Sequence, residues 1–500
     1  SGHVFDTGPS WYLMPEAFEQ YFALMGRDVE QELDLIDLDP RYRVFFEGED
    51  PWGPAEILEV SADSEENWRR FEEMSPGDGE AMRAYAEDAG ELYRLALDRF
   101  LYTTFAQPLG VVSPEVLKRL PRLSSLLTRS LGSRIESKVR DPRLRQILGF
   151  HAVFLGSSPS RAPSLFSLMS HLDLTDGVRY PRGGMYAVIE ALARVAREEG
   201  VEIRTSAPVA RIVVGDHGLA TGVELDTGEV VKADAVVSAA DLHHTETVLV
   251  PEERRTHPEK SWKRRNPGVS ALLVMAEVEG ELPELAHHSL FFTRDWDTNF
   301  SAIMAKELPP VPASVYVSRV DATDPSVSPA GTESLFMLVP FPADPTLGST
   351  EESRAELMAI GRRYLAQVGA WAGIPDLAAR ARILRVTTPA DFADGLGAWQ
   401  GGALGLEHTV LQSAMFRPAN VSDKVPNLLY AGASTTPGIG VPLCLISAEL
   451  VAKRMLGAVD VGPLPTPAPP GFLGRSRDAG VLGNLARRAE NRGLRDGPPR

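Results

Sequence analysis

The chain has 500 residues, of which 43% are hydrophobic, and its formal net charge is −17. A chain of this length buries more than one apolar core, so we expect two or three globular domains. The acidic balance disfavours nucleic acid as a partner, no apolar run is long enough to predict a transmembrane helix, and the single cysteine, Cys444, excludes a disulfide framework and favours a reducing compartment.

The stretch from 101 to 145 reverses the charge of the segment before it. Residues 1 to 100 hold 25 acidic and 8 basic side chains, whereas residues 101 to 145 hold nine basic and three acidic ones. Leucines interleaved with the basic residues predict short helices with one apolar and one basic side. Such helices suit an anionic membrane surface, and an ordinary helical subdomain with solvated arginines fits the same pattern.

Residues 178 to 240 predict a helix followed by a small antiparallel sheet. After the turn Tyr180-Pro181-Arg182-Gly183-Gly184, apolar residues at helical spacing predict a helix that Gly200 ends. Strands are expected at 201 to 204, 207 to 214, 219 to 225 and 229 to 238, with Asp226-Thr227-Gly228 as a hairpin turn. The run from Ala235 to Asp241 ends in small residues, which fit a binding site and a plain crossover equally well.

A glycine-rich turn joins a short strand to a helix in the last fifth of the chain. Residues 427 to 431 predict a buried strand, and a helix is expected from Val441 until Gly457 stops it. Gly432, Gly438 and Gly440 leave room for a ligand to approach the backbone, and the free N–H groups of the helix start favour negative charge. A ligand cradle and a tight strand-to-helix corner both fit this pattern.

The chain changes character again after residue 460. Five prolines between 463 and 470 predict a stiff linker. The segment that follows carries seven arginines and three acids, and we expect it to be disordered.

Five short segments occur in order along the sequence. They are Phe5-Asp6-Thr7-Gly8-Pro9-Ser10, the turn at 180 to 184, the strand at 235 to 241, Gly405-Leu406-Glu407-His408 and Gly432-Ala433-Ser434-Thr435-Thr436-Pro437-Gly438. Together they resemble the bacterial phytoene desaturase family, whose members are flavoproteins built like amine oxidases. The resemblance covers residues 1 to 460.

This resemblance implies an α/β fold of the amine-oxidase-like, FAD-binding type, with an α+β substrate part. A discontinuous FAD domain is expected over 1–60, 178–250 and 385–460, a mostly helical, membrane-facing part over 61–177, and a substrate domain over 251–384, with 461–500 as the Pro/Arg-rich tail. Family members carry a strand and a G-x-G-x-x-G turn upstream of the first segment, and this sequence shows no equivalent. We therefore expect it to lack its N-terminal dinucleotide-binding segment and to bind FAD poorly as it stands.

The resemblance also implies which residues hold FAD. We expect Asp6, Gly8, Pro9 and Ser10 beside the isoalloxazine ring, and the helix start at Gly440 and Val441 beside the flavin pyrimidine. Gly432 and Ala433 are expected at the pyrophosphate and ribityl chain. The backbone of Val209 is expected at the adenine, and Ser238 is expected to bind FAD from the end of the inner strand. Two side chains depart from the wider group. Ala433 stands where an acidic residue often holds the ribityl chain, and Thr436 stands where some desaturases have histidine.

The implied activity is that of an FAD-dependent carotenoid desaturase, most simply one that acts stepwise on phytoene. Its long apolar substrate implies peripheral binding to an anionic membrane, on the inner, cytoplasmic face of the cell membrane. A carotenoid isomerase or ketolase, another amine-oxidase-like flavoprotein, or a flavin-free carotenoid-binding protein are the alternatives. No residue spacing predicts a metal site.

Glu407, with His408 beside it, is the candidate catalytic pair. A carboxylate there would stabilise an allylic cation or accept the proton that a desaturation releases. A structural or solvated pair fits the sequence as well. His151, Arg161 and His171 are polar residues in an apolar region, where they either line the substrate pocket or are held by hydrogen bonds.

Overall fold

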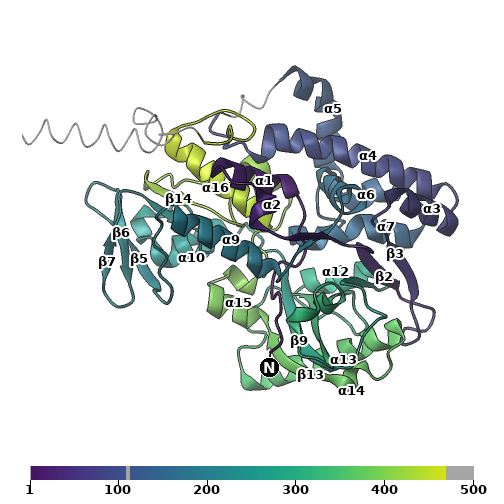
Figure 1. Cartoon of the computed structure of the whole chain (residues 1–500). Helices are drawn as coiled ribbons and strands as arrows, with labels where there is room; N and C mark the ends of the chain where they lie inside the picture. Colours follow the sequence, from purple (N-terminus) through teal and green to yellow (C-terminus); the bar gives the residue numbers. More distant parts are fainter. Residues whose placement is uncertain (1, 108–112, 469–500) are drawn as a thin grey trace, which may run out of the picture.

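The computed structural model describes residues 2–107 and 113–468. Figure 1 shows a large sheet with its covering helices at lower right, a helical part at upper right, and a third part that runs from the centre to a small sheet at left. Residues 108–112 of the basic stretch and 469–500 of the predicted tail lie outside the described residues. Within the described ranges, no helix combines the length and apolar character needed to cross a bilayer.

The large sheet has seven strands in the order β13, β9, β12, β11, β10, β2 and β3. In chain order they are β2 (Tyr42–Phe46), β3 (Glu56–Val60), β9 (Ser270–Glu279), β10 (His288–Phe292), β11 (Val315–Ser318), β12 (Thr332–Phe341) and β13 (Ala381–Thr387). β9 and β12 are antiparallel over ten residues, whereas β10 and β2 are parallel. β2 and β3 lie within the predicted FAD domain (1–60), whereas β9 to β12 lie within the predicted substrate domain (251–384). One sheet therefore joins strands of two predicted domains, and the domain limits stay a prediction.

Helix α13 (Glu351–Ala372) covers one face of the large sheet. Side chains alternate between the two faces of a strand, and even-numbered residues of β9 from Leu272 to Val278 share a buried cluster with α13. The odd-numbered residues from Ala271 to Met275 face the other side, where Phe5 packs against them. The N-terminal segment is thereby fixed to the sheet.

The helical part follows β3. It contains α3 (Ser64–Met74), α4 (Asp78–Ala96), α5 (Pro114–Thr128), α6 (Leu131–Glu136), α7 (Pro142–Gly149) and two 3-10 segments, η3 (Phe150–Leu155) and η4 (Ser164–Leu168). The short helices predicted in the basic stretch are thus present. Arg122 and Arg134 both pair with Asp88 of α4, and Arg122 also reaches Glu91. Acids of α4 therefore neutralise part of the basic side of this region.

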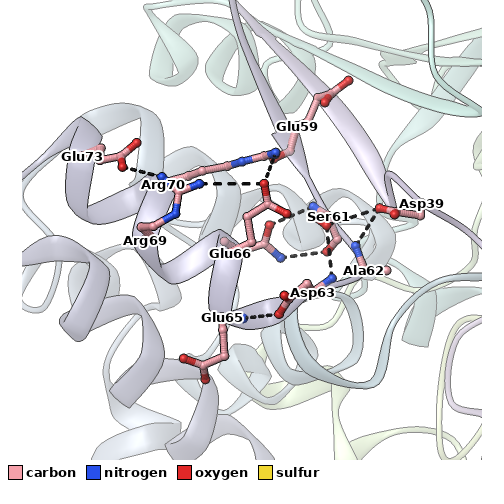
Figure 2. A network of polar contacts seen from close by, with 11 residues as sticks. Asp39, Glu59, Ser61, Ala62, Asp63, Glu65, Glu66, Arg69, Arg70 and Glu73 are labelled. Carbon is pink, nitrogen blue, oxygen red and sulfur yellow. Dashed lines mark hydrogen bonds and ion pairs between the residues drawn. The ribbon is translucent and has the colours of Figure 1, made fainter.

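Figure 2 shows how α3 is tied to the end of β3. The Asp63 side chain accepts a hydrogen bond of 2.9 Å from the N–H of Glu65, which caps the helix. Arg70 reaches back to donate to the carbonyl of Glu59 at 2.8 Å and pairs with Glu66. These bonds set the direction in which the helical part leaves the sheet.

The third part carries most segments of the predicted FAD site. Its elements are α1 (Pro15–Leu24), α9 (Met185–Glu198), β5 (Val209–Val214), β6 (Ala220–Leu225), β7 (Val230–Lys232), β8 (Val236–Ser238), β14 (Leu428–Tyr430) and α16 (Val441–Leu456). The predicted helix after Gly184, the hairpin turn at 226 to 228, the strand before Gly432 and the helix from Val441 are confirmed. The remaining helices are α2 (Val29–Glu32), α8 (Met169–His171), α10 (Leu242–His244), α11 (Glu259–Trp262), α12 (Trp296–Met304), α14 (Leu377–Arg380) and α15 (Pro389–Leu396), and β1 (Leu35–Asp37) pairs with β4 (Arg179–Pro181).

Two predicted strands are wrong. Residues 201 to 204 form no strand, because Val201 and Ile203 are exposed and no described strand pairs with them. The run from 229 to 238 is two strands in different sheets, since β7 is antiparallel to β6 while β8 is parallel to β14. The Asn427 side chain fixes the break by donating to the carbonyl of Asp234 at 2.7 Å.

Candidate functional site

The N-terminal loop is anchored at the start of α9. The Asp6 carboxylate accepts a hydrogen bond of 2.9 Å from the N–H of Met185, the first residue of the helix. Burial raises the pKa of the Asp6 carboxyl group, and the backbone bonds from Met185 and Tyr186 oppose that rise. A side chain at Gly184 would place its Cβ 2.9 Å from Asp6 Oδ1, so glycine permits this approach.

The glycine-rich turn lies at the carboxyl ends of two parallel strands. The N–H of Ala431 donates to the carbonyl of Ser238 at 2.9 Å, which brings the ends of β14 and β8 together. The turn continues into α16, whose N-cap Gly440 provides no side-chain cap. Val441 packs in the same apolar cluster as Met185. The structure therefore joins the loop at 6–10, the start of α9 and the start of α16.

Space above three glycines fits a bound nucleotide. A Cβ at Gly8 would meet no atom within 4 Å, one at Gly432 would meet only the Ala239 carbonyl at 3.6 Å, and one at Gly440 only Pro442 at 3.9 Å. Bare backbone beside open space, together with the uncapped start of the sixteen-residue α16, provides N–H donors for phosphate oxygens. The residues present fit the parts of FAD that these segments are predicted to hold.

The other predicted cofactor contacts are spread over neighbouring elements. Ser238 at the end of β8 has its Oγ 2.8 Å from Thr245 Oγ1. Val209 begins β5 and is 36% exposed. Ser10 is buried and accepts a hydrogen bond from Tyr316. Their contacts with FAD stay predictions.

A buried arginine that sequence reasoning missed holds the glycine-rich turn. Arg417 donates to the carbonyls of Ala433 at 2.6 Å and Thr435 at 3.0 Å, and also to those of Leu406 and Gln412. Burial lowers the pKa of the guanidinium to about 9, so it stays charged at neutral pH. The residues on either side of Arg417 in the sequence do not indicate that its side chain is buried.

Glu407 is fully buried, and both carboxylate oxygens are engaged. Arg161 donates to the two oxygens at 2.8 Å each, and Ser157 donates to one of them at 2.8 Å. A carboxylate in a two-pronged pair with arginine is held in one orientation. Its catalytic role stays a prediction, and the arrangement itself is that of a positioning group.

His408 is buried behind Gly438. Its Nε2 accepts a hydrogen bond from the N–H of Ile439 at 3.3 Å, and its Nδ1 lies 3.2 Å from Ser413 Oγ. Burial, followed by the charge of Arg417, lowers the pKa of His408 well below its usual value, so the ring is neutral. The chain after His408 forms two 3-10 turns, η11 (Val410–Gln412) and η12 (Ala414–Phe416).

The two remaining candidate histidines are paired with acids. His151 Nε2 lies 3.0 Å from Asp173, which also accepts a bond from Tyr42, and His171 Nε2 lies 3.2 Å from Asp176. Among the described residues these histidines do not line the apolar cavity of the next paragraph. Within the same residues no cluster of His, Cys, Asp and Glu is arranged to hold a metal ion.

An apolar cavity of about 110 Å³ lies between the large sheet and the segments η3 and α12. Its walls are mostly aromatic and aliphatic; examples are Phe150, Phe292, Trp296 and Leu338. Tyr316 also lines it, and this phenol connects the cavity to the N-terminal loop because it donates to Ser10 Oγ at 2.8 Å. Such walls accept a hydrocarbon, and because pockets for whole ligands measure about 300 Å³ or more, a cavity of about 110 Å³ fits a part of an apolar chain.

Behind Tyr316 lies a second buried group. Nδ1 of His288 is 2.7 Å from the Tyr316 hydroxyl, and the imidazole stacks on Trp11 with ring centres 4.4 Å apart. Burial raises the pKa of Tyr316 and lowers that of His288 well below its usual value. Both groups are therefore neutral. Neither residue had a motif in the sequence that could have identified it.

Comparison with known proteins places this geometry in a family. The family model described as "flavin containing amine oxidoreductase" matches residues 1–456 of this chain. The carotenoid 3,4-desaturase of Haloarcula japonica is 37% identical over 455 residues, covering 91% of this chain and 89% of that protein. The zeta-carotene-forming phytoene desaturase of Myxococcus xanthus is 34% identical over 458 residues, covering 91% and 85%.

Solved structures agree on the fold. An oxidoreductase from Methanosarcina mazei superposes with a TM-score of 0.53 at 16% identity, covering 85% of this chain and 84% of that one. A triple mutant of putrescine oxidase gives 0.52 at 15% identity, covering 90% of both chains. The amine-oxidase-like fold and the family that the five segments predicted are confirmed, and the chain belongs to the flavin-containing amine oxidoreductases.

Proposed function

We propose that the chain is an FAD-dependent carotenoid desaturase that removes two hydrogens from adjacent carbons of a long, apolar polyene. The observation that carries the proposal is the identity of 37% and 34%, over nine-tenths of the chain, with two carotenoid desaturases. The apolar cavity beside the loop at 6–10 supports a hydrocarbon substrate in particular.

The chain's own residues hold and orient the reactants. The backbone at Gly8, Gly432 and Gly440 and the start of α16 would hold FAD, which when bound supplies the hydride acceptor. The apolar walls of the cavity would contact a part of the polyene and exclude water from it. A polyene carries no charged group, so shape and contact position it.

Loss of a hydride from carbon leaves a proton to be removed from the neighbouring carbon. The Tyr316 hydroxyl, the hydroxyl that joins the cavity wall to Ser10, is the group we assign to this proton. To accept the proton, the phenol must turn its own hydrogen from Ser10 Oγ to Nδ1 of His288, which is 2.7 Å away. Burial disfavours the imidazolium that this transfer forms, so His288 releases the proton again in the same cycle. General-base assistance of this kind contributes about 100-fold or more to a rate.

The two relatives support two different candidate substrates. Stepwise desaturation of phytoene is the first, supported by the Myxococcus enzyme. Desaturation at the 3,4-position of a more conjugated carotenoid is the second, and the higher identity of the Haloarcula enzyme favours it.

We also propose that the enzyme binds peripherally to an anionic membrane, on its cytoplasmic face. Each buried CH₂ contributes about 0.8 kcal/mol, so a long hydrocarbon stays in the bilayer and the protein must reach it there. The carotenoid relatives support this proposal through the nature of their substrates.

The test supplies purified protein with FAD and then, without oxygen, with phytoene or a conjugated linear carotene in detergent. Bleaching of the yellow flavin absorbance together with a longer polyene chromophore is the expected result. Bleaching with the conjugated carotene alone would select the second substrate. A flavin-loaded protein that neither carotenoid bleaches would contradict the proposed function.

A further inference from the structure

Four large apolar side chains project from the two turns η11 and η12. Val410, Leu411, Met415 and Phe416 are 38%, 74%, 51% and 57% exposed, and Leu411 has the highest value among the large apolar side chains of the described residues. Single exposed apolar residues are common, but a group within seven positions marks an interaction site. We call these four residues the apolar tip.

A basic pocket borders the apolar tip. Leu411 and Phe416 line a pocket of about 380 Å³ together with Arg161, Arg264 and Arg265. Glu407 is the acid on its wall, and Arg161 already neutralises it. The pocket therefore carries an excess of positive charge in a chain whose net charge is −17.

One arginine of the pocket is open to an added anion. Arg264 is exposed and has no ion-pair partner among the described residues. The guanidinium of Arg265 lies 4.8 Å from the centre of the Trp262 ring and adds positive charge to the wall of the pocket. Lys260 and Lys263, exposed on or next to α11, extend the basic surface. This arrangement is complementary to phosphate groups.

The apolar tip is held in place from below. Gln412 accepts a bond from the N–H of Asn266 at 2.9 Å and donates to the carbonyl of Glu407 at 2.9 Å. Arg417, the next residue after η12, is fixed by four carbonyls. Leu411 and Phe416 are therefore exposed by a well-bonded segment, so little ordering accompanies binding.

The stretch first expected to contact a membrane is less suited. In α5, Leu117 and Leu120 are exposed, but Arg122 is paired with Asp88 and Glu91. α5 and the segment that carries the apolar tip lie on either side of η4. Leu165 of η4 packs against α5, and the ring centres of Phe166 and His408 are 5.0 Å apart. α5 is thus a natural comparison for the apolar tip.

We propose that the apolar tip inserts into the interfacial layer of an anionic bilayer while Arg264, with Lys260 and Lys263 beside it, binds lipid phosphates. The inference rests on the proposed function, since a carotenoid substrate is what brings the enzyme to a bilayer. Apolar insertion beside a cluster of basic residues is the pattern of interfacial binding, and the overall charge of −17 requires such a local basic site.

The test measures sedimentation of the full chain, loaded with FAD, with vesicles of phosphatidylserine and phosphatidylcholine or of phosphatidylcholine alone. Leu411→Ser/Phe416→Ser should weaken binding to the mixed vesicles tenfold or more. Arg264→Gln should weaken binding to the mixed vesicles several-fold and reduce its salt dependence, with little change on phosphatidylcholine alone. Leu396→Ser, which alters a leucine of α15 that is 66% exposed, is the matched control and should bind as the wild type does.

Two further measurements keep the result decisive. Thermal unfolding checks that each variant is folded, and flavin bleaching by a detergent-solubilised carotene checks the proposed function without a membrane. Normal bleaching with lost vesicle binding supports the inference. Unchanged vesicle binding by the Leu411/Phe416 variant, or a loss caused by Leu117→Ser/Leu120→Ser instead, overturns it whatever the bleaching assay reports.

Discussion

Arg161 and Glu407 lie 246 positions apart in sequence and meet through two hydrogen bonds of 2.8 Å. The Arg161 side chain is 45% exposed, whereas Glu407 is fully buried. Arg161 therefore covers Glu407 from the surface and supplies a positive charge to a carboxylate that water does not reach. The pair connects the segment after η3 to the segment before the glycine-rich turn.

Replacement of Arg161 with methionine should destabilise the protein by about 2 kcal/mol. The change leaves a buried carboxylate with Ser157 as its remaining side-chain donor, and the partial exposure of Arg161 keeps the cost below that of a fully buried pair. Urea unfolding measures the difference. The double variant Arg161→Met/Glu407→Leu removes both charges and should regain most of the loss; a double variant as unstable as the single one would argue against this account.

Glu407→Gln decides between a positioning and a catalytic role. The amide keeps the size of the side chain and loses the charge. If Glu407 only positions the turn, the rate of flavin bleaching should fall by no more than the flavin content of the variant does. A further drop of about 100-fold at equal flavin content would assign it general-base chemistry.

Tyr316→Phe should slow flavin bleaching about 100-fold while the protein still binds FAD. The variant loses the hydroxyl that joins the cavity to Ser10 and His288. Removing these hydrogen bonds should also cost about 1 to 2 kcal/mol of stability. Rates compared at equal flavin content and equal folded fraction separate the two effects, since a merely structural hydroxyl would leave that rate unchanged. A variant with wild-type rate would reject the assignment.

Alanine at two glycines should give opposite results. At Gly438 a Cβ would lie 2.4 Å from the buried ring of His408, so Gly438→Ala should lose about 1 to 3 kcal/mol of stability. At Gly8 a Cβ meets no atom within 4 Å, so Gly8→Ala should unfold like the wild type. If Gly8 faces the flavin, the same methyl group should weaken FAD binding at least tenfold. Urea unfolding and flavin titration measure the two effects.

The buried His287 should make stability depend on pH. Burial, with Arg319 as the second cause, lowers its pKa to about 3 from the usual value of about 6.5. As pH falls below 6.5 the unfolded chain binds a proton that the folded chain refuses, so stability is lost down to pH 3. His287→Asn should remove up to about 1.4 kcal/mol of this loss per pH unit. Unfolding free energies of both proteins at pH 7.5 and 5 test this, and parallel curves would contradict it.

Local signals predicted the parts of the site that are built from adjacent residues. The strand before Gly432 and the helix from Val441 follow from a short apolar run, glycines and Pro442 in the first turn. The split of 229 to 238 into two strands could not be predicted, since the partner of β8 is β14, about 190 positions later. The same holds for Arg417 and Tyr316. Their burial depends on carbonyls and side chains from distant segments. The spacing of apolar residues along the chain does not indicate these distant partners.

Arg417 has one more consequence. Its hydrogen-bond partners among the described residues are carbonyl oxygens, with no carboxylate to cancel its charge. A fixed positive charge in a dry interior creates a local field that favours added negative charge. Because Ala433, which this guanidinium contacts, is a predicted neighbour of the FAD pyrophosphate and ribityl chain, Arg417 should favour binding of that anionic part of the cofactor from behind the turn.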